Sequence, residues 1–284
     1  MSLAKATNLS KTYGNLRALD GFDMTVEPGR IVGLIGPNGS GKTTALKGML
    51  GLIRLDSGDL DVLGLNPYRD REALMRRVAY IVDVGILPRW MKVGDLLDLV
   101  EGVHPTFTRS LAEKGLSTTQ IQKNKKVRTL SKGMIAQLHL SIILAIEADL
   151  LILDEPTLGL DILFRQEFYD RVLNEYYSPE RSVLITTHEV REIEHILTDV
   201  TLIHRGRACL NAAMADLPSM YLKVTTSLKA APEIKELKPL TERQTLKGHE
   251  YILAGADRSV LEKYGDVTTP NLAELFVAII GEQQ

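Results

Sequence analysis

The sequence predicts an α/β fold, because strand-like and helix-like runs follow one another through most of the chain. The run RIVGLIG at residues 30–36 has the continuous apolar character of a buried strand, and KTTALKGMLG at 42–51 continues with helical spacing. A second apolar run, LLIL at 150–153, leads directly into two carboxylates. The chain has 284 residues, 44% of them hydrophobic and 25% charged, which suits one large α/β domain with appendages or two small domains.

The elements follow in a recognisable order. Residues 1–63 alternate short strand-like runs with turns, whereas from about 70 to 147 the apolar residues recur at helical steps, in 70–77, 92–103 and 132–146. The basic run at 122–128 is interpreted as a solvated loop. Strand signals return at 149–155 and 181–189, and a hairpin over 200–210 turns at Arg205–Gly206. The sequence therefore predicts an α/β core interrupted by a helix-rich insertion.

The pattern changes after about residue 215. Strand-like runs at 221–228 and 245–255 precede helical runs at 259–265 and 269–280. In the last of these, Pro270 is expected at the start of the helix with Thr269 as its cap. Because this region carries no catalytic motif, residues 216–284 are predicted to form a small accessory α+β tail.

Bulk composition excludes several classes. The net charge of −2 and an isoelectric point near 6.3 show no basic excess of the kind that binds nucleic acid. A single cysteine, Cys209, excludes an intrachain disulfide and a cysteine-based zinc site. The amino terminus lacks the apolar core of a signal peptide, and no apolar run approaches the roughly 20 residues that span a bilayer. We expect a cytoplasmic protein that reaches a membrane only through a partner.

A glycine-rich loop carries the strongest functional signal. GPNGSGKT, residues 36–43, lies between the strand and the helix described above, which is the context of a phosphate-binding P-loop. Its backbone N–H groups can surround phosphate oxygens, Lys42 can reach the β- and γ-phosphates, and the Thr43 hydroxyl can bind Mg²⁺. The residues expected to bind nucleotide here are Gly36, Pro37, Asn38, Gly39, Ser40, Gly41, Lys42, Thr43 and Thr44.

Two carboxylates follow the apolar run LLIL. Ligands of open α/β sheets lie beyond the carboxyl ends of the strands, so Asp154 and Glu155 are placed to act on the same phosphates. Asp154 can hold Mg²⁺ through a water, and Glu155 can polarise the attacking water.

Taken together, six motifs give the chain a family resemblance. It resembles an ATP-binding-cassette (ABC) transporter ATPase in GPNGSGKTT (Walker A), LLILDEP (Walker B), LSKGM (signature), GLD at 159–161 (D-loop), TTHE at 186–189 (switch histidine) and KTYG at 11–14. The match extends over residues 1–215. It implies a P-loop NTPase core with an antiparallel β subdomain and a helical subdomain at about 84–147. It also implies that Glu155, His188 and Lys42 act in catalysis, that Tyr13 stacks on adenine, and that Asp161 lies at the nucleotide.

The signature loop explains why one chain has two phosphate-binding features. Ser131 is a helix-capping candidate, and a helix start attracts anions. In the family two cassettes pack head to tail, so the resemblance implies that Ser131 and Gly133 contact ATP bound to the partner's Walker A. The partner is a second copy of the chain or a paralogous ABC subunit. The resemblance also implies a membrane permease, which holds the protein on the inner face of the cell membrane.

Two positions depart from the family pattern. Asp83 occupies the place of a glutamine that binds Mg²⁺ and links to the permease, so Asp83 is a candidate metal ligand beside Thr43 and Asp154. In LSKGM, Lys132 and Met134 replace the commoner glycine and glutamine; Lys132 either faces solvent or adds charge near the phosphates.

The branch of the family is a further expectation. The LSKGM variant and the tail suggest the exporter branch that includes bacitracin and multidrug efflux cassettes. Trp90 either faces a permease or packs within the helical region. The alternative is a regulatory ABC ATPase that is not coupled to transport. A cassette acting on ribosomes or DNA is disfavoured, because the chain has neither a second cassette nor a long coiled coil.

Overall fold

The computed structural model describes residues 2–82, 87–227, 231–246 and 248–281. The strands are β1 (Ala4–Tyr13), β2 (Leu16–Val26), β3 (Ile31–Ile35), β4 (Ser57–Val62), β5 (Val78–Val82), β6 (Leu150–Asp154), β7 (Ser182–Thr187), β8 (Asp199–His204), β9 (Arg207–Ala213), β10 (Tyr221–Thr226), β11 (Thr241–Thr245), β12 (Gly248–Ala254) and β13 (Gly265–Thr268). The α-helices are α1 (Lys42–Met49), α2 (Arg71–Met75), α3 (Val93–Val103), α4 (Arg109–Ser117), α5 (Lys132–Leu144), α6 (Ile162–Arg171), α7 (Val190–Ile193), α8 (Leu217–Met220), α9 (Ala231–Glu236), α10 (Arg258–Leu261) and α11 (Leu272–Gly281).

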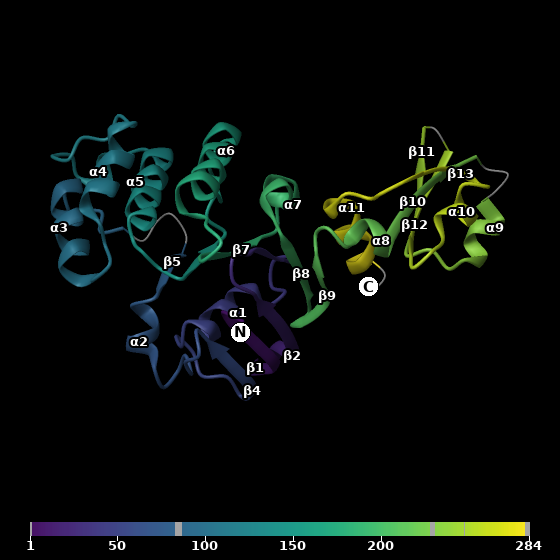
Figure 1. Cartoon of the computed structure of the whole chain (residues 1–284), viewed down its shortest axis with the longest axis horizontal. Coiled ribbons are helices and arrows are strands. Elements are labelled where there is room, and N and C mark those ends of the chain that lie inside the picture. The colour runs from purple at the N-terminus through teal and green to yellow at the C-terminus, as the bar shows by residue number, and fades with distance from the viewer. Residues whose placement is uncertain (1, 83–86, 228–230, 247, 282–284) are drawn as a thin grey trace.

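A mixed sheet forms the centre of the molecule (Figure 1). Its strands follow the order β5-β6-β7-β3-β8-β9. All neighbouring pairs are parallel except β8 and β9, which form the predicted hairpin. Strands β3, β6 and β7 are buried along their whole length, as expected for a parallel sheet covered on both faces. The predicted α/β class is confirmed.

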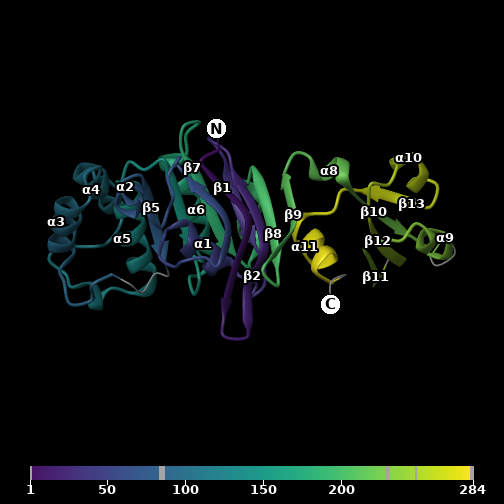
Figure 2. The same ribbon diagram turned by 90° about the horizontal axis from the view of Figure 1, so that it is seen from below.

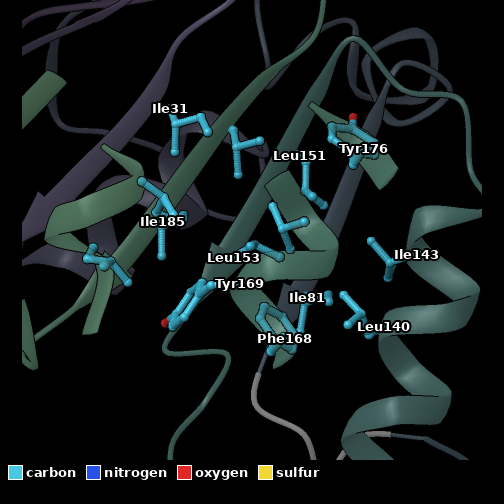
Figure 3. Packing of buried hydrophobic residues seen from close by; sticks show 14 of the residues in the cluster. Ile31, Ile81, Leu140, Ile143, Leu151, Leu153, Phe168, Tyr169, Tyr176 and Ile185 are labelled. Atoms are coloured by element: carbon cyan, nitrogen blue, oxygen red, sulfur yellow. The ribbon is translucent and has the colours of Figure 1, made fainter. Parts of the chain in front are cut away.

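Each face of this sheet has its own apolar layer. On one face the side chains of Val32, Ile152 and Leu184 pack against α1 and against the antiparallel sheet β2-β1-β4. On the other face Leu153 and Ile185 pack with residues of α5 and α6, such as Leu140 and Phe168 (Figure 3). Both layers hold the carboxyl ends of β3, β6 and β7 at one edge of the sheet.

The helix-rich insertion lies between β5 and β6 in the sequence. Its helices α3, α4 and α5 gather at one end of the molecule, and the C-terminal unit lies at the other (Figures 1 and 2). Ser131 caps α5 as predicted: its hydroxyl accepts a hydrogen bond from the Met134 N–H at 3.2 Å. Within the described ranges, no helix is long and apolar enough to cross a membrane.

The C-terminal unit has the order of elements β10-α9-β11-β12-α10-β13. Its strands form an antiparallel sheet in the order β11-β12-β10-β13, which is the ferredoxin-like arrangement. Residues of α9 and α10 cover one face around Val224, Tyr251 and Leu253. Helix α11 then returns to the central core, where Leu272 and Leu275 join the apolar layer beside α7.

The start of α11 differs from the expected one. The helix begins at Leu272, two residues after Pro270, and Thr269 forms no cap. Instead the Asn271 side chain accepts from the Glu274 N–H at 2.8 Å, and the Glu274 carboxylate accepts from the Asn271 N–H at 2.9 Å. This reciprocal capping box satisfies two backbone donors at once, which a threonine before a proline cannot do.

Candidate functional site

The loop between β3 and α1 is shaped by close backbone packing. At Gly41, φ is 112°, and a Cβ there would lie 2.5 Å from the Ala18 carbonyl oxygen, so only glycine fits. From the β8–β9 turn, the Gly206 N–H donates to the Ser40 carbonyl at 2.8 Å. Pro37 is half-buried and Asn38 and Gly39 are exposed, so the outer side of the loop faces solvent. The loop residues 36–41 therefore form a supported turn whose free N–H groups can receive a ligand.

Lys42 lies at the inner side of this loop. Its ammonium group donates to the carbonyl oxygens of Gly36 at 2.7 Å and Pro37 at 3.3 Å, and lies 3.3 Å from Glu155 Oε1. The side chain is only 6% exposed. Nearby, the Ser40 hydroxyl is buried and has no hydrogen-bond partner among the described residues. A buried cation and an unpartnered hydroxyl at one loop are what a phosphate-binding site needs.

Asp154 lies at the end of β6, opposite Thr186 of β7 in the parallel register. The Thr186 hydroxyl donates to Asp154 Oδ1 at 2.6 Å, and the Thr43 hydroxyl lies 3.4 Å from the same oxygen. Thr43 and Asp154 are 111 residues apart in the sequence, yet the sheet brings them together. Thr44, the next residue of α1, is half-buried.

This donor set fits Mg²⁺. No group of three or more histidine, cysteine or acidic side chains is arranged to hold a metal in the described chain. Mg²⁺ does not need such a cage, because it keeps several waters and takes one or two protein oxygens beside the phosphates. The Thr43 hydroxyl and the Asp154 carboxylate are placed to offer those two oxygens. Asp83, the third candidate ligand, lies outside the described residues.

Glu155 is held in an uncommon backbone conformation. Its φ is 48°, in the left-handed region that costs free energy for any residue except glycine. The Glu155 N–H donates to the backbone carbonyl of Thr186 at 3.2 Å and to its hydroxyl at 3.1 Å, which fixes the turn. The carboxylate then lies between two basic groups, with Lys42 on one oxygen and His188 Nδ1 at 2.9 Å from the other.

The signature residues lie apart from this cluster. Ser131 and Gly133 are at the start of α5, and no hydrogen bond joins them to residues 36–44 in the part of the chain that the structure describes. Gly133 packs tightly against α6, since a Cβ there would lie 2.9 Å from the Phe164 ring. Asp161 caps the same helix, its side chain accepting from the N–H groups of Leu163 and Phe164 at 3.1 Å.

Three further residues of interest have exposed side chains. Tyr13 is 46% exposed at the end of β1, with the Lys11 ammonium 5.4 Å from its ring centroid. Lys132 is exposed beside Ser131. Trp90 is 70% exposed, so the interpretation that it packs within the helical region is wrong.

Sequence reasoning missed two residues beside Asp154. Thr186 connects Asp154 with the backbone of Glu155, and its position opposite Asp154 follows only from the pairing of β6 with β7. Tyr80 of β5 has a buried hydroxyl without a described partner. Burial and the nearby Asp154 charge raise the pKa of this phenol. Neither residue type stands out in an apolar run, so no sequence signal could have found them.

A second missed cluster connects the loop after Glu155 with α7. The Thr157 hydroxyl contacts Tyr169 at 3.1 Å and donates to Glu192 at 3.3 Å, and Arg165 forms an ion pair with Glu192. Arg165 also donates to the Leu160 carbonyl at 2.7 Å. These bonds link the loop that holds Asp161 to the helix that follows His188.

Comparison with known proteins identifies the family. A family model described as ABC transporter matches residues 19–158. The Nod factor export ATP-binding protein I of Cupriavidus metallidurans is 31% identical over 267 residues, which cover 87% of this chain and 84% of that protein. The chain belongs to the ABC transporter family. It is an ATP-binding subunit of that family and an ATPase, which binds ATP with Mg²⁺.

Other relatives agree with this assignment. The bacitracin transport ATP-binding protein BcrA of Bacillus licheniformis is 32% identical over 229 residues, covering 78% of this ABC ATPase and 72% of BcrA. A solved structure titled as the ATP-binding subunit of an ABC transporter superposes with a TM-score of 0.68 at 26% identity. That likeness covers 76% of this chain and 92% of the solved one.

Proposed function

We propose that this ABC ATPase powers an exporter by hydrolysing ATP for a separate membrane permease. Its relatives support export: they include the Nod factor export protein, the bacitracin transport protein, and the daunorubicin resistance ATP-binding protein DrrA2 of Streptomyces coeruleorubidus, which is 28% identical over 314 residues. In this proposal residues 1–215 form the ATPase domain and residues 216–284 an accessory tail. The permease holds the protein at the inner face of the cell membrane.

The observation that carries the catalytic proposal is the carboxylate of Glu155 held between Lys42 and His188. Glu155 accepts a proton from the water that attacks the γ-phosphate, since a general base must lie within hydrogen-bond reach of that water. With its proton on Nδ1, His188 donates to Glu155 and orients it. Lys42 exchanges its contacts with loop carbonyls for the β- and γ-phosphates.

The remaining nucleotide contacts follow from position. The backbone N–H groups of Asn38, Gly39 and residues 41–44 surround the phosphates, and Tyr13 offers a half-exposed ring for the adenine. Thr43 and Asp154 would hold Mg²⁺, which would neutralise charge on the phosphates; Asp83 is proposed as a further ligand on sequence alone.

The exposed start of α5 supports a paired arrangement. The Ser131 hydroxyl and the N-terminal N–H groups of a 13-residue helix can bind an anion, but no hydrogen bond among the described residues joins them to this chain's own Walker A. In the proposed head-to-tail pair, Ser131 and Gly133 therefore contact ATP on a second copy or on a paralogous subunit. Asp161 caps α6, which packs against the signature helix α5.

A permease surface is proposed around Trp90. An exposed indole is uncommon on a solvated face and is enriched where proteins meet. Trp90 lies in the short stretch that leads from β5 into α3, seven residues beyond Asp83, so it can link the metal side of the site to a membrane partner.

Glu155→Gln tests the catalytic assignment. The amide keeps the shape of the carboxylate but cannot accept a proton, so we expect the hydrolysis rate to fall by about 10²–10⁴-fold. ATP binding, measured with a fluorescent analogue and Mg²⁺, should be retained. Glu147→Gln is the matched control, because this exposed carboxylate makes only a 3.9 Å ion pair on the surface. A Glu155→Gln protein that hydrolyses ATP at the normal rate would overturn the proposal.

A further inference from the structure

A cavity of about 180 Å³ lies between the C-terminal unit and the segment that follows His188. Its walls come from the open face of β10, β11 and β12, from α11, and from Arg191 of α7. Figure 1 shows α11 between α7 and the C-terminal strands. None of the residues assigned to the nucleotide lines it.

The face of the C-terminal sheet that α9 and α10 leave uncovered carries several charged side chains. Side chains alternate along a strand, so Leu222 and Val224 face α9 and α10, whereas Lys223 faces the cavity. On β12, Tyr251 and Leu253 likewise face the helices, while Glu250 and Ile252 line the cavity. A face that served only to pack against α11 would not need these charges.

Two exposed guanidinium groups, those of Arg191 and Arg243, line the cavity without a protein partner among the described residues. Neither Arg191 nor Arg243 forms a hydrogen bond or an ion pair within the described ranges, even though Arg243 lies opposite Glu250 in the strand register. By contrast, Lys223 is engaged by Glu274 at 2.8 Å. A planar guanidinium matches a carboxylate with two parallel hydrogen bonds, so the free pair indicates an anionic ligand.

The cavity also has an apolar side. Ile252 is buried beneath it, and Ala273 and the exposed Val277 of α11 line the wall. A cavity of about 150 Å³ accommodates benzene, so 180 Å³ suits a compact apolar body of similar size. Three basic and two acidic side chains line the space, which favours a singly charged anion over a dianion such as phosphate.

The cavity has a direct connection to the nucleotide site. Arg191 lies three residues after His188, on α7. Immediately beyond, the Glu194 carboxylate accepts from the Leu272 N–H at 2.8 Å, which fastens the start of α11 to the same segment. A ligand bound between Arg191 and the C-terminal sheet therefore contacts the same segment that carries the switch histidine, His188.

We propose that this cavity binds a small monocarboxylate with a compact apolar body, and that its occupancy alters ATP turnover through α7. The guanidinium groups of Arg191 and Arg243 bind the carboxylate, and Ile252, Ala273 and Val277 contact the apolar body. The second part of the proposal rests on the proposed function, whereas the binding itself does not.

Calorimetric titration of the full chain without nucleotide tests the binding. The probes are 4-methylpentanoate, its neutral amide and inorganic phosphate. We expect one saturable site for 4-methylpentanoate and at least tenfold weaker binding of the other two. Arg191→Gln and Arg243→Gln should each weaken binding of 4-methylpentanoate at least tenfold. Ala273→Leu should fill the cavity and abolish binding. Lys263 is an exposed cation outside the cavity, so Lys263→Gln should leave binding unchanged. Equal binding of acid and amide, or no saturable binding of the acid, would refute the site.

Steady-state ATP hydrolysis tests the coupling. Saturating 4-methylpentanoate should change kcat or KM at least twofold in the wild-type protein, and Arg243→Gln should hydrolyse ATP normally but lose this response. A wild-type protein that binds the probe with no change in either constant would exclude the coupling. A protein that hydrolyses no ATP even without the probe would instead contradict the proposed function, so the two failures are distinguishable.

Discussion

The Thr186 hydroxyl contacts both acidic residues of the site, Asp154 and Glu155. It donates to Asp154 at 2.6 Å and accepts from the Glu155 N–H at 3.1 Å, so it acts as a positioning residue for both. The sequence predicted Asp154 and Glu155, because two acids after an apolar run are conspicuous. It could not predict Thr186, because a threonine in SVLITT looks like any β-branched strand residue until β6 and β7 are paired.

Replacing this hydroxyl should affect rate and stability separately. In Thr186→Val the buried Asp154 carboxylate loses a hydrogen bond, which should lower the free energy of unfolding by about 1–3 kcal/mol. The rate should also fall about tenfold at unchanged KM, because Glu155 loses its orientation, and Thr186→Ser should restore most of it. Thr201→Val removes a buried hydroxyl from β8 and serves as the control, with lower stability but a normal rate. Urea unfolding and steady-state kinetics distinguish the two effects.

His139 gives the fold a pH dependence of its own. It is buried in α5, and burial lowers its pKa to about 4. An unfolded histidine titrates near 6.5, so the unfolded chain takes up the proton first as the pH falls. The stabilisation is therefore complete above pH 6.5 and is lost as the pH falls from 6.5 to 4.

The size of this contribution is measurable by substitution. Over the window from pH 6.5 to 4 His139 should account for a loss of up to about 3 kcal/mol in the free energy of unfolding. His139→Leu should remove that portion of the pH dependence, whereas His195→Gln, at an exposed position, should not. Urea unfolding at pH 7 and pH 4.5 measures both, and identical pH profiles for the wild type and His139→Leu would contradict the assignment.

Among the elements, the strands of the central sheet were the most predictable. The apolar runs gave β3, β6 and β7 within one or two residues, because fully buried parallel strands need continuous Val, Ile and Leu. The order β5-β6-β7-β3-β8-β9 was not predictable, since pairing between strands over 100 residues apart leaves no local pattern. The contact between Thr43 and Asp154 depends on that order.

Helix α11 was predicted in type but not in its start. A proline is favoured at a first helical turn, yet Asn271 and Glu274 offer a stronger local solution. Asn271→Ala should lower the free energy of unfolding by about 1 kcal/mol, whereas Thr269→Ala, at an exposed position without a cap, should have no effect. Chemical denaturation measures both, and the reverse ranking would restore Thr269 as the cap.

At the scale of the whole molecule, the tail was predicted as a separate accessory piece, and the structure shows how it is fastened. Its ferredoxin-like sheet has its own apolar cluster, but α11 packs into the central core and receives the Glu194 carboxylate at its start. The spacing of apolar residues in the sequence predicts an apolar face on α11, but it does not show which part of the molecule covers that face. For the same reason, the sequence could not show the cavity at Arg191.

The proposed head-to-tail pair predicts that two inactive variants restore ATP hydrolysis when they are mixed. If Ser131 completes the partner's site, Ser131→Arg and Glu155→Gln should each abolish hydrolysis alone, because both sites of each symmetric pair are defective. Mixing the two variants creates hybrid pairs in which one site has an intact Glu155 from one chain and an intact Ser131 from the other. That site should hydrolyse ATP, and random mixing should return roughly a quarter of the normal rate.

A control separates this complementation from recovery of a single chain. A chain that carries both substitutions, mixed with Ser131→Arg, leaves every site without an intact Ser131 and should stay inactive. Ser131→Thr keeps the hydroxyl both for the cap at the Met134 N–H and for the partner's nucleotide, so it should be nearly normal. If the first mixture is as inactive as its components, Ser131 does not serve the partner's nucleotide, and the exposed start of α5 has another role.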